Sequence, residues 1–292
     1  MNTRGAAALC AAAVVLLSAC TPTDGPFTAR KSGASTTAKV RSLVPTKVPT
    51  TAPTARVSAP PQPAALTRNP IYRAGKLTAP RCAEPAMPPT SLRNVQTYYA
   101  EFVACLNKAW APVVRKAGFT FTPPKLAVVP AKTPSSPCDG DDAWAFYCGD
   151  TIYLGAQKNL DDYKRRPGVA LAWMALTIAH EYGHHVQALA GMRLAKYEWG
   201  ITANGADAQR EESRRVELQA DCFGGAYFGA DQASFPVDGE WLDLRNKAIR
   251  NSIDPDHDHG GVANLALWHF NGFEAAGPSA CDTYTADSTV VG

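Results

Sequence analysis

The sequence predicts an α+β domain that is mainly helical and has a small sheet. Two long segments in the second half of the chain carry apolar residues at helical spacing, and two shorter runs rich in Val, Ile, Tyr and Phe have the length of strands. Eight cysteines are many for a cytosolic protein and indicate disulfides or a metal. The chain of 292 residues is 46% hydrophobic and 19% charged, which excludes a wholly disordered or collagen-like protein.

The first twenty residues are typical of an export signal. Arg4 lies in a short polar start, Ala6–Leu17 is an apolar core, and Leu17-Ser18-Ala19-Cys20 matches a bacterial lipobox. We therefore expect residues 1–19 to be a lipoprotein signal peptide and Cys20 to carry lipid, palmitate included, as the first residue of the mature protein. The lipid would hold the protein on the extracytoplasmic face of the cell membrane. The alternative is an ordinary secretory signal in which Cys20 is incidental.

Residues 20–81 are predicted to be a disordered tether. The segment is rich in Thr, Pro, Ala and basic residues and poor in aromatics, so it cannot bury enough apolar surface to offset its ordering entropy. Residues 21–81 hold ten Lys or Arg and one acid, Asp24, whereas residues 82–292 hold more acids than bases. The acidic body argues against nucleic acid as a partner, because phosphates need a positive surface.

The predicted domain, residues 82–292, opens with a helix. Thr90-Ser91 is a good helix start, Gly118 marks the end, and Pro112 should kink or shorten the last turns. Its apolar positions at helical spacing are Val95, Tyr99, Phe102, Val103, Leu106 and Trp110.

Two strands are expected after this helix. Lys125–Val129 follows the Pro123-Pro124 breaker, and Ala145–Leu154 contains Gly149-Asp150 as a bulge or turn. Phe146–Leu154 could be an edge strand on which an extended peptide lies by strand addition.

Four more helices are predicted. Val169–Leu189 is apolar along almost its whole length, and Gln209–Phe228 is charged at its start and apolar later. Two weaker helical patterns lie near Trp241–Arg250 and Val262–Phe273.

Six cysteines remain once Cys10 is removed with the signal and Cys20 carries lipid. An even number in an exported domain predicts disulfides, with fifteen pairings possible. A zinc–cysteine cluster is the competing interpretation, and the lack of any CxxC pair in the sequence argues against it. Nearness in sequence favours Cys82–Cys105, Cys138–Cys148 and Cys222–Cys281.

His180-Glu181-Tyr182-Gly183-His184 is an HExxH motif inside the predicted helix Val169–Leu189. Residues i and i+4 share one helix face, so His180 and His184 can reach one zinc ion. Glu181 would then lie beside the metal and could hold a water. Gly183 is costly inside a helix unless another element packs closely there. The next residue, His185, is expected to turn away from the metal.

Glu217 and Asp221 form a second i and i+4 pair, on the apolar part of a predicted helix. Two buried acids are expensive without a cation. We predict Glu217 as the third metal ligand and Asp221 as the acceptor for the other ring nitrogen of a ligand histidine, with His180 as first choice. The alternative is that Glu217 pairs with Arg214 or Arg215 on a solvated helix face.

These two motifs, His180–Gln187 and Glu217–Cys222, resemble those of the Putative neutral zinc metallopeptidase family, bacterial proteins of the zincin type. The resemblance spans roughly residues 90–285. The chain departs from the family pattern at Asn264-Leu265, where Gln-Arg is usual, and at His269, where Phe is usual. Further matching pieces are Pro123–Leu126, Phe146–Cys148, Ile152–Leu154, His259-Gly260, Trp268, Gly272-Phe273 and Cys281–Thr283.

The resemblance implies a zincin-like fold with the HExxH helix at its core and one Zn²⁺ per chain. Peptide bonds would be hydrolysed by a zinc-bound water that Glu181 assists. A second electrophile is usual at such a site, and His259 is the first choice, ahead of Tyr182, Tyr197 and Tyr227. The alternative for His259 is an exposed acidic loop, which it would share with His257, Asp254, Asp256 and Asp258.

The expected function is that of a membrane-anchored, outward-facing zinc metallopeptidase with a peptide or protein substrate. The competing hypothesis is a non-catalytic envelope lipoprotein that uses a zincin-like domain to bind a partner, since a fold does not determine a function.

Overall fold

The computed structural model describes residues 62–131, 134–138, 143–200, 205–237, 239–250 and 257–292. The expected signal peptide, Cys20 and the tether up to residue 61 lie outside the described residues. The described part falls in one compact unit, Val57–Gly292. None of its helices is long and apolar enough to cross a membrane.

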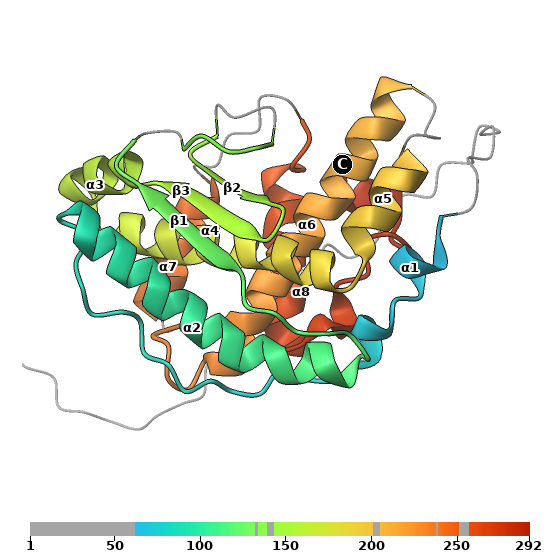
Figure 1. Cartoon of the computed structure of the whole chain (residues 1–292), viewed down its shortest axis with the longest axis horizontal. Coiled ribbons are helices and arrows are strands. Elements are labelled where there is room, and N and C mark those ends of the chain that lie inside the picture. Colours follow the sequence, from blue (N-terminus) through green and yellow to red (C-terminus); the bar gives the residue numbers. More distant parts are fainter. Residues whose placement is uncertain (1–61, 132–133, 139–142, 201–204, 238, 251–256) are drawn as a thin grey trace, which may run out of the picture. The chain divides into compact units, whose positions relative to one another are not determined.

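The described residues are mainly helical and include one three-stranded sheet, which confirms the predicted α+β class (Figure 1). The α-helices and strands are α1 (Ala64–Thr67), α2 (Leu92–Lys116), β1 (Lys125–Val129), β2 (Ala145–Cys148), β3 (Thr151–Gly155), α3 (Ala156–Arg165), α4 (Pro167–Leu189), α5 (Met192–Gly200), α6 (Ala206–Asp231), α7 (Gly239–Arg250) and α8 (Val262–Ala275). Three short 3₁₀ helices are η1 (Pro70–Arg73), η2 (Pro278–Ala280) and η3 (Ser288–Val290).

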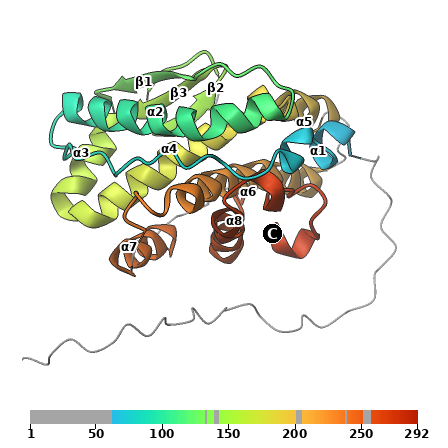
Figure 2. The same ribbon diagram turned by 90° about the horizontal axis from the view of Figure 1, so that it is seen from below.

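Helix α4, which carries the HExxH motif, is the central element. It contacts α2 and β2 on the sheet side and α6 and α7 on the other, so the sheet, α4 and α6 follow one another in layers (Figure 2). Ile178 and Tyr182 of α4 are fully buried. The motif therefore lies in the core, as the apolar residues around it predicted.

The sheet has the order β1-β3-β2, with β1 parallel and β2 antiparallel to β3. The single strand expected over Ala145–Leu154 is a hairpin of two strands, because Gly149 adopts φ +66° at the turn. Strand β2 lies at one edge of the sheet and contacts α4.

Helix α2 begins where the sequence predicted, with the Ser91 hydroxyl accepting from the Asn94 N–H at 3.2 Å. Pro112 does not shorten it: the helix continues to Lys116 and ends before Gly118, which adopts φ +89°. Helices α3 and α5 were not predicted. Only Ala156 and Asn159 of α3 are buried, because the helix is mostly polar, and a polar segment gives a weak apolar signal in the sequence.

The prediction of a tether up to residue 81 is wrong for its last twenty residues. Leu66 and Ile71 are fully buried, and Asn69 donates to the Ala190 carbonyl at 3.0 Å. The Tyr72 hydroxyl accepts from Gln219 of α6 at 2.7 Å and donates to the Leu66 carbonyl at 2.8 Å. A few large side chains that find places in the core thus order a segment whose composition alone indicates disorder.

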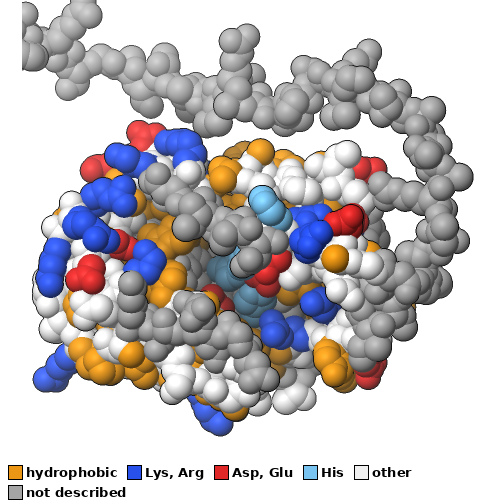
Figure 3. Space-filling model, turned by 90° about the horizontal axis from the view of Figure 1, so that it is seen from above, with side chains coloured by type: hydrophobic (Ala, Val, Ile, Leu, Met, Phe, Trp, Pro, Cys, Tyr) orange, Lys and Arg blue, Asp and Glu red, His pale blue; other side chains and the backbone are white. Residues whose placement is uncertain are grey.

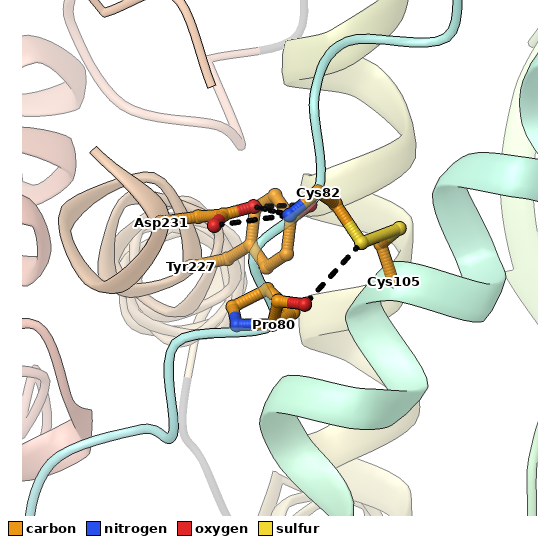
Figure 4. Close-up of a disulfide and its surroundings, with 5 residues drawn as sticks. All are labelled: Pro80, Cys82, Cys105, Tyr227 and Asp231. Carbon is orange, nitrogen blue, oxygen red and sulfur yellow. Dashed lines mark hydrogen bonds between the residues drawn. A yellow bond between two sulfur atoms is a disulfide. The ribbon is translucent and has the colours of Figure 1, made fainter. Parts of the chain in front are cut away.

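The structure forms all three predicted disulfides, Cys82–Cys105, Cys138–Cys148 and Cys222–Cys281. The first fastens the N-terminal segment to α2, where the Cys82 N–H also donates to the buried Asp231 carboxylate of α6 (Figure 4). The second ties β2 to the preceding loop, and the third ties α6 to the C-terminal segment.

Helices α4 and α6 run antiparallel and pack backbone to backbone. A Cβ added to Gly183 would lie 2.5 Å from the Ala220 carbonyl oxygen, and one added to Gly224 would lie 3.2 Å from the Ala179 carbonyl carbon. This close contact confirms the expectation drawn from Gly183. It also sets the helix separation at the point where the two sequence motifs face each other.

We predict that Gly183→Ala lowers the free energy of unfolding by about 1–3 kcal/mol, the usual cost of overpacking. The clash outweighs the roughly 1 kcal/mol that alanine gains in helix propensity. Metal affinity should fall as well, because the helices that carry the predicted ligands must move apart. Urea unfolding and a chelator competition measure the two effects. Gly239→Ala, with nothing within 4 Å of the added Cβ, is the matched control. A Gly183→Ala protein as stable as this control would contradict the prediction.

Candidate metal centre

His180 and His184 lie one turn apart on α4, and Glu217 of α6 faces them both. The Glu217 Oε2 atom lies 3.1 Å from the Nε2 atom of each histidine. One ligand atom from each of the three residues lies within 4.8 Å of the others. The structure therefore brings together the three residues that the sequence predicted as metal ligands.

The second ring nitrogen of each histidine is also held. His180 Nδ1 lies 3.0 Å from Asp221 Oδ1, and His184 Nδ1 lies 2.9 Å from Gln187 Oε1. Gln187 uses its amide NH₂ to donate to the Val216 carbonyl at 2.8 Å, so its oxygen is the atom that accepts from His184. Each Nδ1–H can donate to its partner, which fixes the orientation of the ring and leaves Nε2 facing Glu217, where a metal can be bound.

Asp221 contacts His180 as expected, whereas Gln187 was not singled out from the sequence. Its place three residues after His184 on one helix face is the signal that could have identified it.

Within the cluster of His180, His184 and Glu217, the two histidines keep the Glu217 carboxyl ionised. Burial alone would raise the pKa of this carboxyl, but His184 and His180 hold that pKa well below its usual range. The proposed alternative partners are engaged elsewhere: Arg214 donates to the Val291 and His257 carbonyls, and Arg215 to the Ala286 carbonyl and Glu211. Pairing of Glu217 with either arginine is therefore wrong.

Glu181 is a buried carboxyl beside the cluster. Burial and the nearby Glu217 raise its pKa, against the opposing effect of His180, His184 and His259. Its Oε2 atom is buried and has no hydrogen-bond partner among the described residues. A buried acceptor without a partner is costly, so a bound water or a substrate group is needed to satisfy it.

His259 approaches the cluster from the loop before α8. Its Nε2 atom lies 3.6 Å from Glu217 Oε2, and its ring lies 6.4 Å from the His180 ring. Its Nδ1 atom lies 2.6 Å from Asp258 Oδ1, and about half of the side chain is exposed. His257 is exposed, and Asp254 and Asp256 lie outside the described residues. The loop is thus acidic and partly exposed, as the alternative held, yet it places His259 at the site.

The other candidate side chains point elsewhere. The Tyr182 hydroxyl donates to Asn107 at 2.7 Å, the Tyr227 hydroxyl donates to Asp231, and Tyr197 on α5 is 68% exposed. His185 turns away from the cluster, as expected. Its Nε2–H donates to the Thr122 carbonyl at 2.8 Å, and its Nδ1 accepts from the Tyr147 hydroxyl at 3.2 Å.

The donor set fits zinc. Two imidazole nitrogens and one carboxylate oxygen are typical ligands of a catalytic zinc, which keeps a fourth position for water or substrate. The site is also reachable: histidine side chains with acidic ones beside them lie in a hollow of the face seen in Figure 3.

We predict that Asp221→Asn weakens zinc binding by about 10- to 100-fold, because an amide without charge is a poorer acceptor for the His180 ring N–H. The dissociation constant, measured by competition with a chromogenic chelator, tests this. Asp243→Asn makes the same change at an exposed position on α7 and should leave zinc affinity unchanged. An unaltered affinity in Asp221→Asn would show that Asp221 does not support the metal centre.

A family model described as Putative neutral zinc metallopeptidase matches residues 76–284, which include both helices of the cluster. The chain is similar to the uncharacterized protein YpfJ of Escherichia coli strain K12, with 29% identity over 199 residues, 62% of this chain and 69% of the relative. It is also similar to the uncharacterized protein Rv2575 of Mycobacterium tuberculosis strain H37Rv, with 30% identity over 132 residues, 37% of this chain and 43% of the relative. No solved structure gives a significant match. The chain, with its α+β zincin-like fold, belongs to the Putative neutral zinc metallopeptidase family.

Proposed function

We propose that the protein is a zinc-dependent metallopeptidase that hydrolyses peptide bonds. The observation that carries the proposal is the convergence of His180, His184 and Glu217 within 4.8 Å, with the buried carboxyl of Glu181 beside them. One zinc ion per chain would be held by these three residues. Bound zinc supplies Lewis acidity, which makes water acidic near neutral pH and polarises a carbonyl.

Glu181 is the proposed general base. Its Oε2 atom has no partner among the described residues and can accept the proton of the attacking water. Its raised pKa favours proton transfer closer to neutral pH than an exposed glutamate would allow. The same carboxyl can later deliver the proton to the leaving amine.

His259 is the proposed electrophile for the oxyanion that forms on the scissile carbonyl. Burial alone would lower its pKa, but Glu217 and Asp258 raise it above the usual value, which favours the protonated ring. A protonated ring can donate from Nε2 toward the centre, while Asp258 accepts from Nδ1.

We propose that an extended peptide binds along strand β2. Within the described residues this strand pairs only with β3, so its other edge is free to accept main-chain hydrogen bonds. Strand β2 contacts α4, the helix that carries His180 and His184, which supports a peptide bound along β2 near these residues.

The protein is proposed to act on the extracytoplasmic face of the cell membrane, anchored by lipid on Cys20. The lipobox and the apolar leader support this location. Three disulfides fit an oxidising compartment.

We predict that Glu181→Gln keeps zinc at one ion per chain and slows peptide hydrolysis by about 10²- to 10⁴-fold, the usual contribution of a general base. Metal analysis and digestion of a broad peptide library measure the two outcomes. Glu101→Gln makes the same change at an exposed position on α2 and should retain activity.

Persistent hydrolysis by Glu181→Gln would remove Glu181 from the mechanism. Wild-type protein that carries one zinc ion and cleaves no peptide would instead favour the non-catalytic lipoprotein that binds a partner.

We predict that Cys20→Ser releases the exported protein from the membrane, because acylation needs the thiol. Fractionation of cells expressing each form, followed by immunoblotting, tests this. Cys10→Ser, upstream of the lipobox, should remain in the membrane fraction. An exported Cys20→Ser protein that still sediments with membranes would contradict lipid anchoring.

A further inference from the structure

Arg245 on α7 is a buried cation without a carboxylate partner among the described residues. The residue is 8% exposed, and its Nη2 donates to the Asn246 side chain at 2.9 Å. Its Nε–H has no acceptor in the described part of the chain, and burial lowers its pKa without an opposing acid. Burying an unpaired charge is costly, so this guanidinium is expected to have an anion as a partner when the protein acts.

His269 on α8 is a second buried group that lacks a partner. It is 3% exposed, and its Nε2 has no hydrogen bond to any described residue. Burial, helped by the positive charges of Arg245 and His180, lowers the pKa of this ring to about 3. The imidazole is therefore neutral at physiological pH and can donate one N–H without adding charge.

His269 lies close to the metal centre. The His269 carbonyl packs on Gly225 of α6, where an added Cβ would lie 2.0 Å from it, and Gly225 is one turn after Asp221, the partner of His180. One helix turn is about 5.4 Å along the axis. The His269 backbone therefore lies about one turn along α6 from the residue that supports a metal ligand.

Helix α7, which carries Arg245, packs on the same aromatic ring as His269. Trp241, one turn before Arg245, packs on Phe228 with ring centroids 5.1 Å apart, and the Phe228 ring also lies 5.8 Å from His269. Helices α7 and α8 contact each other, α7 also contacts α4, and α8 also contacts α6, so they lie on one side of the helices that carry the cluster (Figures 1 and 2).

We propose that Arg245 and His269 form a carboxylate-binding subsite beside the metal centre, so that the protein favours peptides with a carboxylate within a few residues of the cleaved bond. The inference rests on the proposed function and names its substrate class. One guanidinium charge and one neutral N–H donor match a singly charged, planar carboxylate, which a guanidinium binds through two parallel hydrogen bonds. A phosphate dianion would keep one charge uncompensated. The carboxylate is either the C-terminus of the peptide or an Asp or Glu side chain.

Direct binding tests the subsite without hydrolysis. N-acetyl-L-alanine and its neutral analogue, N-acetyl-L-alanine amide, are titrated separately into the zinc-loaded protein. Calorimetry measures the dissociation constant of each. The acid should bind wild-type protein better than the amide, and Arg245→Met should weaken acid binding about 10- to 100-fold. Lys247→Met removes an exposed cation from the same helix and should change nothing. Equal affinity of wild type and Arg245→Met for the acid would overturn the proposal.

His269→Phe is the second variant, because a phenyl ring fills a similar space. It should weaken binding of the acid by about 3- to 10-fold, as expected for loss of one neutral donor. The thermal midpoint of Arg245→Met separates binding from a structural role. Removing an unpaired buried charge should leave the midpoint unchanged or raise it. A lowered midpoint with unchanged acid affinity would assign Arg245 to the fold alone and overturn the proposal.

Peptide kinetics identify the source of the carboxylate. One cleaved peptide is made in three forms. The first has a free C-terminal carboxylate, the second is the neutral C-terminal amide, and the third is that amide with Glu in place of a Gln near the cleaved bond. Arg245→Met should raise KM about 10- to 100-fold for the form whose carboxylate enters the subsite and leave kcat and the neutral form unchanged. If wild-type protein cleaves no peptide, the proposed function fails while the acid titration still decides the subsite. If Arg245→Met cleaves every form with unchanged KM, the subsite fails and the proposed function stands.

Discussion

The approach of α4 to α6 is the constraint on which the site depends. Ala179 and Gly183 of α4 meet Gly224 and Ala220 of α6 with almost no side-chain volume between the two backbones. Because the helices are this close, the Glu217 side chain reaches both imidazoles from the opposite helix. A residue with a larger side chain at any of these contacts would move His180 and His184 on one helix away from Glu217 on the other.

Contacts with α8 and with the C-terminal segment also hold α6 in position. Helix α8 packs on α6 through Gly272, where an added Cβ would lie 1.9 Å from the Cys222 carbonyl oxygen, and Cys222 is itself bonded to Cys281. The buried Arg215 donates to carbonyls of the C-terminal segment, and the Thr283 hydroxyl donates back to the Arg215 carbonyl at 2.7 Å. Hydrogen bonds, a disulfide and backbone contacts thus hold the helix that supplies Glu217 and Asp221.

Local spacing explains what the sequence could predict. His180 and His184, like Glu217 and Asp221, are one turn apart on a helix, and costly buried acids indicate a cation whatever the rest of the fold. The disulfide pairs are near in sequence except Cys222–Cys281, which spans 59 residues. Other features depend on tertiary contacts that leave no periodic pattern. Leu66 and Ile71 are isolated apolar residues in a polar segment, and Arg245 looks like any helix surface cation until α8 and α4 cover it.

The ordered segment before Cys82 determines how the domain responds to a pulling force at its N-terminal end. Gln62 begins the described segment and donates to Glu212 of α6 at 3.5 Å. Asn69 then donates to the carbonyl of Ala190, directly after α4, and the Tyr72 hydroxyl accepts from Gln219. Among the described contacts, tension would therefore act first on the one between Gln62 and α6, the helix that bears Glu217. Extension would stop at the disulfide between Cys82 and Cys105 of α2. About twenty residues, 62–81, can therefore detach before the force reaches the rest of the domain.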